Sequence, residues 1–143
     1  MANFIETKRG TWTNSLTASS LLQLVDHVDI ARFAAAAFQD PATYHGRKLG
    51  VVSEELRVQD AMDRLAEEIG DGRSIKAIFM TDEEVAHEQD KGSWLFFSEP
   101  CVRYMSNYTD MEEPERLVPG LTTFKKFLVR EKEAVMKTYL SSQ

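Results

Sequence analysis

The chain has 143 residues, of which 43% are hydrophobic and 28% are charged, so it can bury the core of one domain and is too apolar for a disordered chain. Its net charge of −6 disfavours general binding to the phosphates of nucleic acids. Neither a secretion signal nor a run of about 20 apolar residues is present, and the single cysteine, Cys101, excludes an internal disulfide and a cysteine-based zinc site. We therefore expect a cytoplasmic protein.

The first third of the chain predicts a loop, a strand and a helix, in that order. Residues 1–20 are polar, with Trp12 as an aromatic anchor, and indicate a loop or an irregular hairpin. The apolar run 21–28 predicts a strand. Asp29 then stands at the N-cap position of an alanine-rich helix, which Pro41 ends.

Two further strands and two helices are predicted in the middle of the chain. The strands cover 48–52 and 74–80. An amphipathic helix over 58–69 carries its apolar residues on one face and has Gly70 at its C-terminal cap. The sequence T-D-E-E at 81–84 has the spacing of a capping box and opens the next helix.

The last third is predicted to be helical apart from an acidic loop. Five side chains recur at helical spacing along a helix that must bend at Pro100, and they are Trp94, Phe97, Cys101, Tyr104 and Tyr108. An acidic loop over 109–121 follows, and Thr123 opens a final helix whose Phe124, Phe127, Leu128 and Val135 face inward. The whole order predicts one α/β or α+β domain over 1–143, with a small few-stranded sheet and four to five helices.

Glycine and histidine positions give no cofactor or metal motif. The seven glycines form neither G-x-G-x-x-G nor a phosphate-binding loop. The three histidines lack the spacing of a zinc helix, and the acidic loop lacks the calcium-binding pattern. We therefore expect no cofactor and no metal.

The segment that begins at Leu24 resembles a known family. A strand ends in Asp-Ile, an alanine-rich helix follows, and then come D-P-A-T-Y-H-G-R, a strand, an amphipathic helix and glycine. This order is similar to the C-terminal portion of the NmrA-like family of atypical short-chain dehydrogenase/reductases. The opening M-A-N-F and the closing L-T-T-F-K-K-F-L also resemble that family, whereas Arg57 stands where the family commonly has a serine or threonine cap.

The resemblance implies that a cofactor-binding half is missing. In that family the first half binds NAD(P) and the second half closes over the substrate, so no cofactor-binding residue can be transferred to this sequence. The segments matching 48–52 and 30–39 pack on the first half in the family. Without it their apolar surface faces water, and we expect a homodimer or a partner chain to cover it. Basic side chains over 125–137 and acidic ones over 81–116 also allow an acidic partner.

Candidate site residues fall into two groups. The aromatic face can line a pocket for a hydrophobic small molecule or simply fill the core, and its proposed substrate-binding members are Phe4, Trp12, Trp94, Phe97, Cys101 and Tyr108. His27 is the acid/base candidate, because on a strand it shares a face with Asp29, which can orient its ring. Asp26 points to the opposite face and is a second candidate, as is the Tyr104 hydroxyl. Alternatively, Asp29 is only a helix cap and His27 a surface residue.

Three functions are compatible with these features. The first is a cofactor-independent enzyme of the isomerase, cyclase or dehydratase type, acting on a hydrophobic intermediate such as a natural product. The second is a non-catalytic pseudo-reductase that binds a ligand or a protein. The third is an accessory subunit of a separate nucleotide-binding protein.

Overall fold

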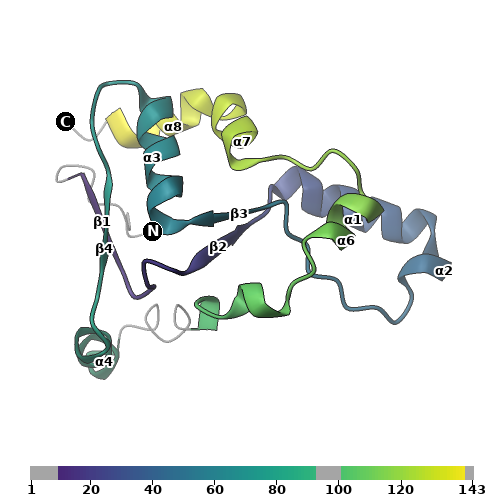
Figure 1. The fold of residues 1–143 in the computed structure, drawn as a ribbon. Coiled ribbons are helices and arrows are strands. Elements are labelled where there is room, and N and C mark those ends of the chain that lie inside the picture. Colours follow the sequence, from purple (N-terminus) through teal and green to yellow (C-terminus); the bar gives the residue numbers. More distant parts are fainter. Residues whose placement is uncertain (1–9, 93–100, 141–143) are drawn as a thin grey trace.

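The computed structural model describes residues 10–92 and 101–140 and shows a mixed α/β fold (Figure 1). Strand β1 (Thr11–Asn14) pairs in parallel with β4 (Lys76–Phe79), and β2 (Leu21–Leu24) pairs antiparallel with β3 (Glu54–Arg57). The strand β1 lies in a segment that we expected to be a loop or hairpin. It forms because a partner more than sixty residues away supplies its hydrogen bonds, and no local pattern signals that partner.

The first helix begins three residues earlier than the sequence predicts. Strand β2 ends at Leu24, and α1 spans His27–Gln39. Its N-cap is Asp26, whose side chain accepts a hydrogen bond from the backbone N–H of Val28, so the assignment of Asp29 as the cap is wrong. Asp26 and Asp29 are both residue types that suit an N-cap. Asp29 is not available for this role because its carboxylate binds Arg32 and the backbone N–H of Thr122. Helix α1 is followed by the short α2 (Pro41–Tyr44).

The expected strand over 48–52 is wrong, and the strand lies at β3 instead. The register places Leu24 opposite Glu54, and the N–H of Ser53 donates to the Leu24 carbonyl. Helix α3 (Val58–Ile69) follows β3 directly and confirms the amphipathic helix, with Gly70 at a positive φ as its C-cap. Arg57 at its N-cap position gives no side-chain cap bond.

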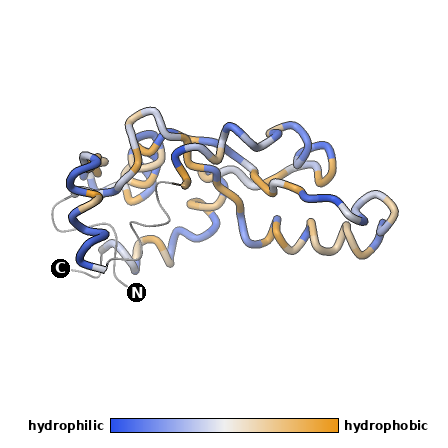
Figure 2. Tube along the Cα trace, turned by 90° about the horizontal axis from the view of Figure 1, so that it is seen from below, coloured by the Kyte–Doolittle hydropathy of each residue, from blue (hydrophilic) through white to orange (hydrophobic). Residues whose placement is uncertain are grey.

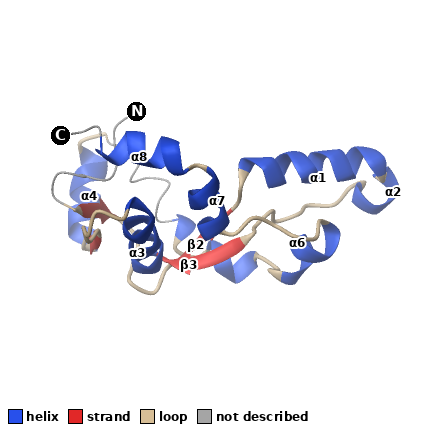
Figure 3. Ribbon diagram, turned by 90° about the horizontal axis from the view of Figure 1, so that it is seen from above, coloured by secondary structure: helices blue, strands red, loops and turns tan. Residues whose placement is uncertain are grey.

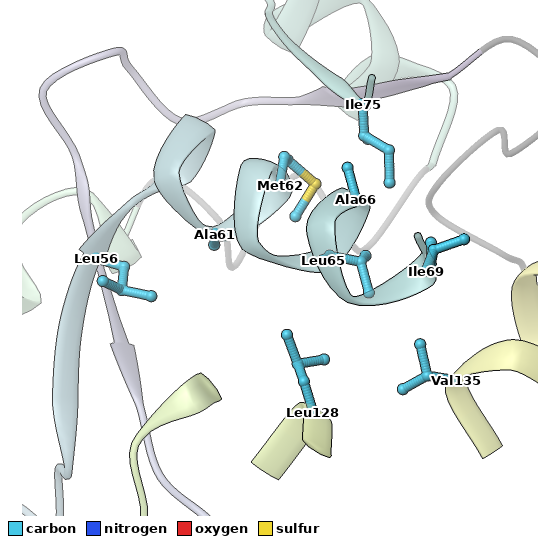
Figure 4. Packing of buried hydrophobic residues seen from close by; sticks show 9 residues of the cluster. All are labelled: Leu56, Ala61, Met62, Leu65, Ala66, Ile69, Ile75, Leu128 and Val135. Atoms are coloured by element: carbon cyan, nitrogen blue, oxygen red, sulfur yellow. The ribbon is translucent and has the colours of Figure 1, made fainter. Parts of the chain in front are cut away.

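The main core lies where α3 packs against β4 and the two last helices (Figure 4). Helices α7 (Phe124–Arg130) and α8 (Lys132–Leu140) form where one final helix was predicted, and Thr123 is confirmed as the N-cap. The buried members of this core are Leu56, Ala61, Met62, Leu65, Ala66, Ile69, Ile75, Leu128 and Val135. A smaller cluster joins Phe33 of α1 to Val118 and Leu121, which precede α7.

The remaining helices correct two expectations. Helix α4 (Asp82–Asp90) has the predicted capping box between Thr81 and Glu84. The described part of the expected helix over 94–108 includes a 3-10 turn at Met105–Tyr108, and α6 (Glu112–Leu117) forms inside the expected acidic loop. Within the described ranges no helix has the length and apolar character needed to cross a membrane.

Seen from above, the elements divide into two ends (Figure 3). Helices α3, α4, α7 and α8 gather at one end, and α1, α2 and α6 extend from the other. The strands β2 and β3 run between the two ends. The junction, where β2 passes into α1 beside α7, is therefore where side chains from distant parts of the sequence can meet.

Candidate functional site

A pocket of about 220 Å³ lies at this junction. Its walls come from the end of β2, the residues before β3 and the start of α7, and they are Leu24, Val25, Asp26, Ser53, Thr122, Phe124 and Phe127. Most of these side chains are apolar, and a few polar groups stand among them. That combination is typical of small-molecule sites, although the volume is below the usual range of about 300–1,000 Å³.

Asp26 is the charged group of the pocket and is 5% exposed. Its Oδ1 accepts the backbone N–H of Val28 at 2.7 Å, and its Oδ2 accepts Nη2 of Arg130 at 2.7 Å. Burial raises the pKa of this carboxyl, but the hydrogen bonds from Arg130 and Val28 outweigh burial and hold the pKa below its ordinary value. Asp26 is therefore ionised at neutral pH.

Two phenylalanines and Arg130 define the aromatic side of the pocket. The rings of Phe124 and Phe127 are nearly parallel, with centroids 6.3 Å apart and planes 11° apart. The guanidinium of Arg130 lies 5.6 Å from the Phe127 centroid, within the range of a cation–π contact. Arg130 therefore fixes both the Asp26 carboxylate and one pocket ring.

Glu54 fixes the other ring by binding the start of α7. Its Oε2 accepts the backbone N–H of Phe124 at 2.7 Å, and its Oε1 accepts Nη1 of Arg64 at 2.6 Å. Nearby, Ser53 donates its hydroxyl to the Leu24 carbonyl at 2.9 Å. The sequence predicts Phe124 and Phe127 as inward-facing but does not indicate four other site residues, which are Ser53, Glu54, Thr122 and Arg130. No short-range motif marks these four, since each meets its partner through the fold.

Asp29 supports the pocket from inside the protein and is completely buried. Its Oδ1 accepts Arg32 Nη1 at 2.7 Å, and its Oδ2 accepts the backbone N–H of Thr122 at 2.6 Å. Burial raises its pKa, but the hydrogen bonds from Thr122 and Arg32 lower the pKa by more. Asp29 therefore holds Thr122, which lines the pocket, against α1.

His27 lies outside this network. It is the first residue of α1 rather than part of a strand, and its side chain is 72% exposed. Its Nδ1 is 3.7 Å from Asp26 Oδ1, which is a contact longer than a hydrogen bond. The structure thus brings His27 to Asp26, and the expected shared strand face of His27 and Asp29 is wrong because helical geometry turns Asp29 inward and His27 outward.

The predicted aromatic face is not assembled in the described residues. Cys101 is exposed, and Tyr104 and Tyr108 are 61% and 88% exposed. Their spacing requires helical geometry up to Tyr108, whereas the chain makes a turn at 103–104 and a 3-10 segment at Met105–Tyr108. Trp12 instead packs against the main core. Phe4, Trp94 and Phe97 lie outside the described residues.

A second pocket of about 310 Å³ lies beside α4, lined by Thr13, Ile78, Met80, Glu84, His87 and Glu88. Glu84 is engaged in its capping box, and Glu88 accepts Lys91 Nζ at 2.7 Å. Across residues 10–92 and 101–140, no group of three or more histidine, cysteine or acidic side chains is placed to hold a metal ion.

Comparison with known proteins finds a likeness in fold to a solved structure. No family model and no curated protein matches the sequence. The solved structure of triphenylmethane reductase from a Citrobacter species, a protein of the NmrA-like group, matches with a TM-score of 0.61 at 16% identity. The match covers 94% of this chain and 46% of that one. The chain therefore shares a fold with about half of a reductase of this type.

Proposed function

We propose that this chain is a ligand-binding module with a reductase-type fold, and that it binds a small aromatic molecule in the Asp26 pocket. The observation that carries the proposal is an ionised, buried carboxylate beside two nearly parallel phenyl rings. The rings offer a stacking surface. The carboxylate offers one strong hydrogen-bond acceptor. Together they favour a ligand that combines a flat ring with a polar donor.

The volume of the pocket limits the size of this ligand. An apolar cavity of roughly 150 Å³ holds one benzene molecule. A pocket of about 220 Å³ therefore fits a single substituted ring better than a fused or multi-ring molecule. The reductase with the similar fold is described as acting on triphenylmethane dyes, which are also aromatic.

The negative charge of Asp26 determines which polar group the ligand should carry. A carboxylate oxygen has more than one lone pair, so Asp26 can accept a further donor beside Val28 and Arg130. A phenol or an aromatic amine supplies such a donor, whereas an aromatic acid would bring a second negative charge to Asp26. We therefore expect neutral phenols and aromatic amines to bind in preference to benzoates.

The same contacts favour binding over catalysis. A general base works best with a pKa near the operating pH, and the pKa values of Asp26 and Asp29 are lowered instead. Both carboxylates are engaged by arginine and backbone N–H groups. Such contacts are typical of carboxylates that hold a structure in place, here the segment at Thr122 and the bound ligand.

Binding of 4-ethylphenol, compared with ethylbenzene, tests the proposal. We expect the phenol to bind at least tenfold more tightly, because a hydrogen bond to a charged group contributes about 1.5–3 kcal/mol. In the Asp26→Asn variant this preference should fall severalfold, while the helix keeps a good N-cap. The measurement is a ligand-observed NMR titration of each probe.

Asp63→Asn is the matched control, because Asp63 is an exposed aspartate on α3 away from the pocket. It should leave both affinities unchanged. The proposal is wrong if neither probe binds the wild-type chain, or if Asp26→Asn keeps the full preference for the phenol.

A second candidate function is a cofactor-independent enzyme of the isomerase, cyclase or dehydratase type. The contact of His27 Nδ1 with Asp26 at the edge of the pocket is the specific observation that favours it. A histidine beside a carboxylate can take a proton from a bound ligand and return it. This candidate needs the His27 ring to turn toward the pocket.

Deuterium exchange at the α-carbon of 4-hydroxyphenylacetone tests this second candidate. General acid–base catalysis is worth about 10²–10⁴-fold, so His27→Gln should slow protein-catalysed exchange by at least 100-fold. His45→Gln, an exposed histidine outside the pocket, should not. Equal exchange rates in the two variants, or no acceleration by the wild-type chain, would exclude His27 as an acid/base group.

A further inference from the structure

We propose that two copies of this chain pair through the outward face of α1, with the two helices antiparallel. This inference is independent of the ligand pocket. It rests on the distribution of charged, small and large side chains around α1, which differs from that of a helix facing water.

The outward face of α1 is apolar. The exposed residues between the helix ends are Val28, Ile30, Ala31, Ala34, Ala35 and Phe38. Figure 2 shows the α1 trace mainly in the hydrophobic part of the colour range. A surface helix normally places polar and charged residues on this side.

Both charged residues of α1 are engaged on the inward side. Asp29 is completely buried, and Arg32 donates to Asp29 and to the carbonyls of Pro119 and Gly120. Asp29 and Arg32 therefore bind the loop before α7, and the side chains that α1 exposes on its outward face are apolar. The solvent side of α1 has no charged side chain between His27 and Gln39.

The exposed side chains are large enough to form the centre of an interface. Phe38 is 85% exposed, Ile30 50% and Val28 44%. Together with the alanines they give an apolar patch on the order of several hundred Å², the scale on which exposed apolar patches mark binding surfaces. A standard interface buries about 800 Å² on each partner. The α1 patch is smaller than this, so we expect a weak dimer that forms as the protein concentration rises.

The sizes of the side chains specify a second copy in antiparallel orientation. Alanines at the middle of the helix let two backbones approach closely, with Ala31 of one copy opposite Ala35 of the other. The large ring of Phe38 then packs over the smaller Val28 at the other end of the second helix. In a parallel pair, two Phe38 rings would meet and hold the helices apart.

The polar side chains at the two ends of α1 agree with this orientation, because an imidazole N–H can donate a hydrogen bond to a carboxylate. His27, at the N-terminal end, is 72% exposed. The exposed Asp40, just beyond the C-terminal end, has its pKa lowered by hydrogen bonds from Thr43 and is ionised. Antiparallel pairing places Asp40 of one copy near His27 of the second, and it also aligns the helix dipoles favourably. Parallel pairing would bring two Asp40 carboxylates together.

Light scattering during size-exclusion chromatography tests the pairing. We expect the wild-type chain to approach the mass of a dimer as its concentration rises from about 1 to about 200 µM, because a small interface of this kind forms a weak, concentration-dependent pair. Ala34→Glu, at the centre of the face, should remain a monomer throughout. Ala134→Glu, at an exposed position on α8, makes the same chemical change elsewhere and should dimerise like the wild type. Circular dichroism of both variants checks that they stay folded.

Single cysteines in a Cys101→Ser background test the orientation. With the helix centre at position 33 and a rise of 1.5 Å per residue, antiparallel pairing offsets the two copies of position 34 by about 3 Å along the axis and those of position 39 by about 18 Å. Ala34→Cys should therefore form an intermolecular disulfide under mild oxidation, and Gln39→Cys should not.

Three results would overturn the proposal. The first is a wild-type monomer at about 200 µM. The second is an Ala34→Glu variant that still dimerises while folded. The third is a Gln39→Cys variant that cross-links as fast as Ala34→Cys, because this would require a parallel pair.

Discussion

Replacing Asp29 with alanine is expected to lower the free energy of unfolding by about 3 kcal/mol. The carboxylate is completely buried and accepts hydrogen bonds from Arg32 and from the backbone N–H of Thr122. Its removal leaves the Thr122 N–H without this acceptor and leaves the Arg32 guanidinium without its carboxylate partner. Arg32 keeps the carbonyls of Pro119 and Gly120 and is 38% exposed, which limits the loss. Urea denaturation at pH 7 gives the value.

Two variants separate the role of Asp29 from a general effect of losing a carboxylate. Asp63→Ala removes an exposed aspartate and should change the free energy of unfolding by less than about 0.5 kcal/mol. Asp29→Asn keeps an oxygen acceptor for Thr122 and should fall between wild type and alanine. If Asp29→Ala unfolds at the same urea concentration as Asp63→Ala, the Asp29 network does not stabilise the fold.

The contribution of the Asp26 and Asp29 carboxylates to stability can also be measured as a dependence of the free energy of unfolding on pH. In the folded chain the pKa values of Asp26 and Asp29 lie below the ordinary aspartate value, so the unfolded chain binds protons first as the pH falls. The stabilisation from these carboxylates is therefore complete above about pH 5 and is lost as the pH falls below about 4, toward the folded pKa values. Asp29→Asn should be less stable at pH 7 but lose less stability between pH 5 and pH 3 than the wild type.

Leu128→Ala should also destabilise the chain by about 3 kcal/mol, within the usual range of 2–5 kcal/mol for such a truncation. Leu128 is 3% exposed. Figure 4 shows its side chain directed from α7 toward Leu65 and the rest of the α3 face. Alanine leaves a cavity between α3 and α7 that the surrounding helices cannot fully close. Thermal and urea unfolding measure the effect.

The neighbouring residue provides the matched control for this truncation. Val129 is 56% exposed, so Val129→Ala removes hydrocarbon from the same helix without opening the core and should change stability by less than about 0.5 kcal/mol. Leu128→Ala should also weaken binding of 4-ethylphenol, because α7 carries both pocket rings. Similar stabilities of the two variants would show that α7 does not depend on packing against α3.

The sequence determined the elements whose signals are local. The stripe of α3 repeats every three to four residues, and the caps at Gly70, Thr81 and Thr123 use hydrogen bonds to groups a few residues away. Such patterns are complete within one turn or one helix. The same locality explains why a strand over 74–80 is predicted, because exposed and partly buried residues alternate along β4 from Lys76 to Phe79.

Only the tertiary structure decided which of the two aspartates caps α1 and where the pocket lies. Arg130 meets Asp26 across 104 positions, and Thr122 meets Asp29 across 93. Strand β1 likewise depends on a distant partner. These contacts exist because packing α7 on α3 brings the end of the chain to the start of α1. A periodicity or a capping motif describes neighbours along the chain and contains no information about such pairs.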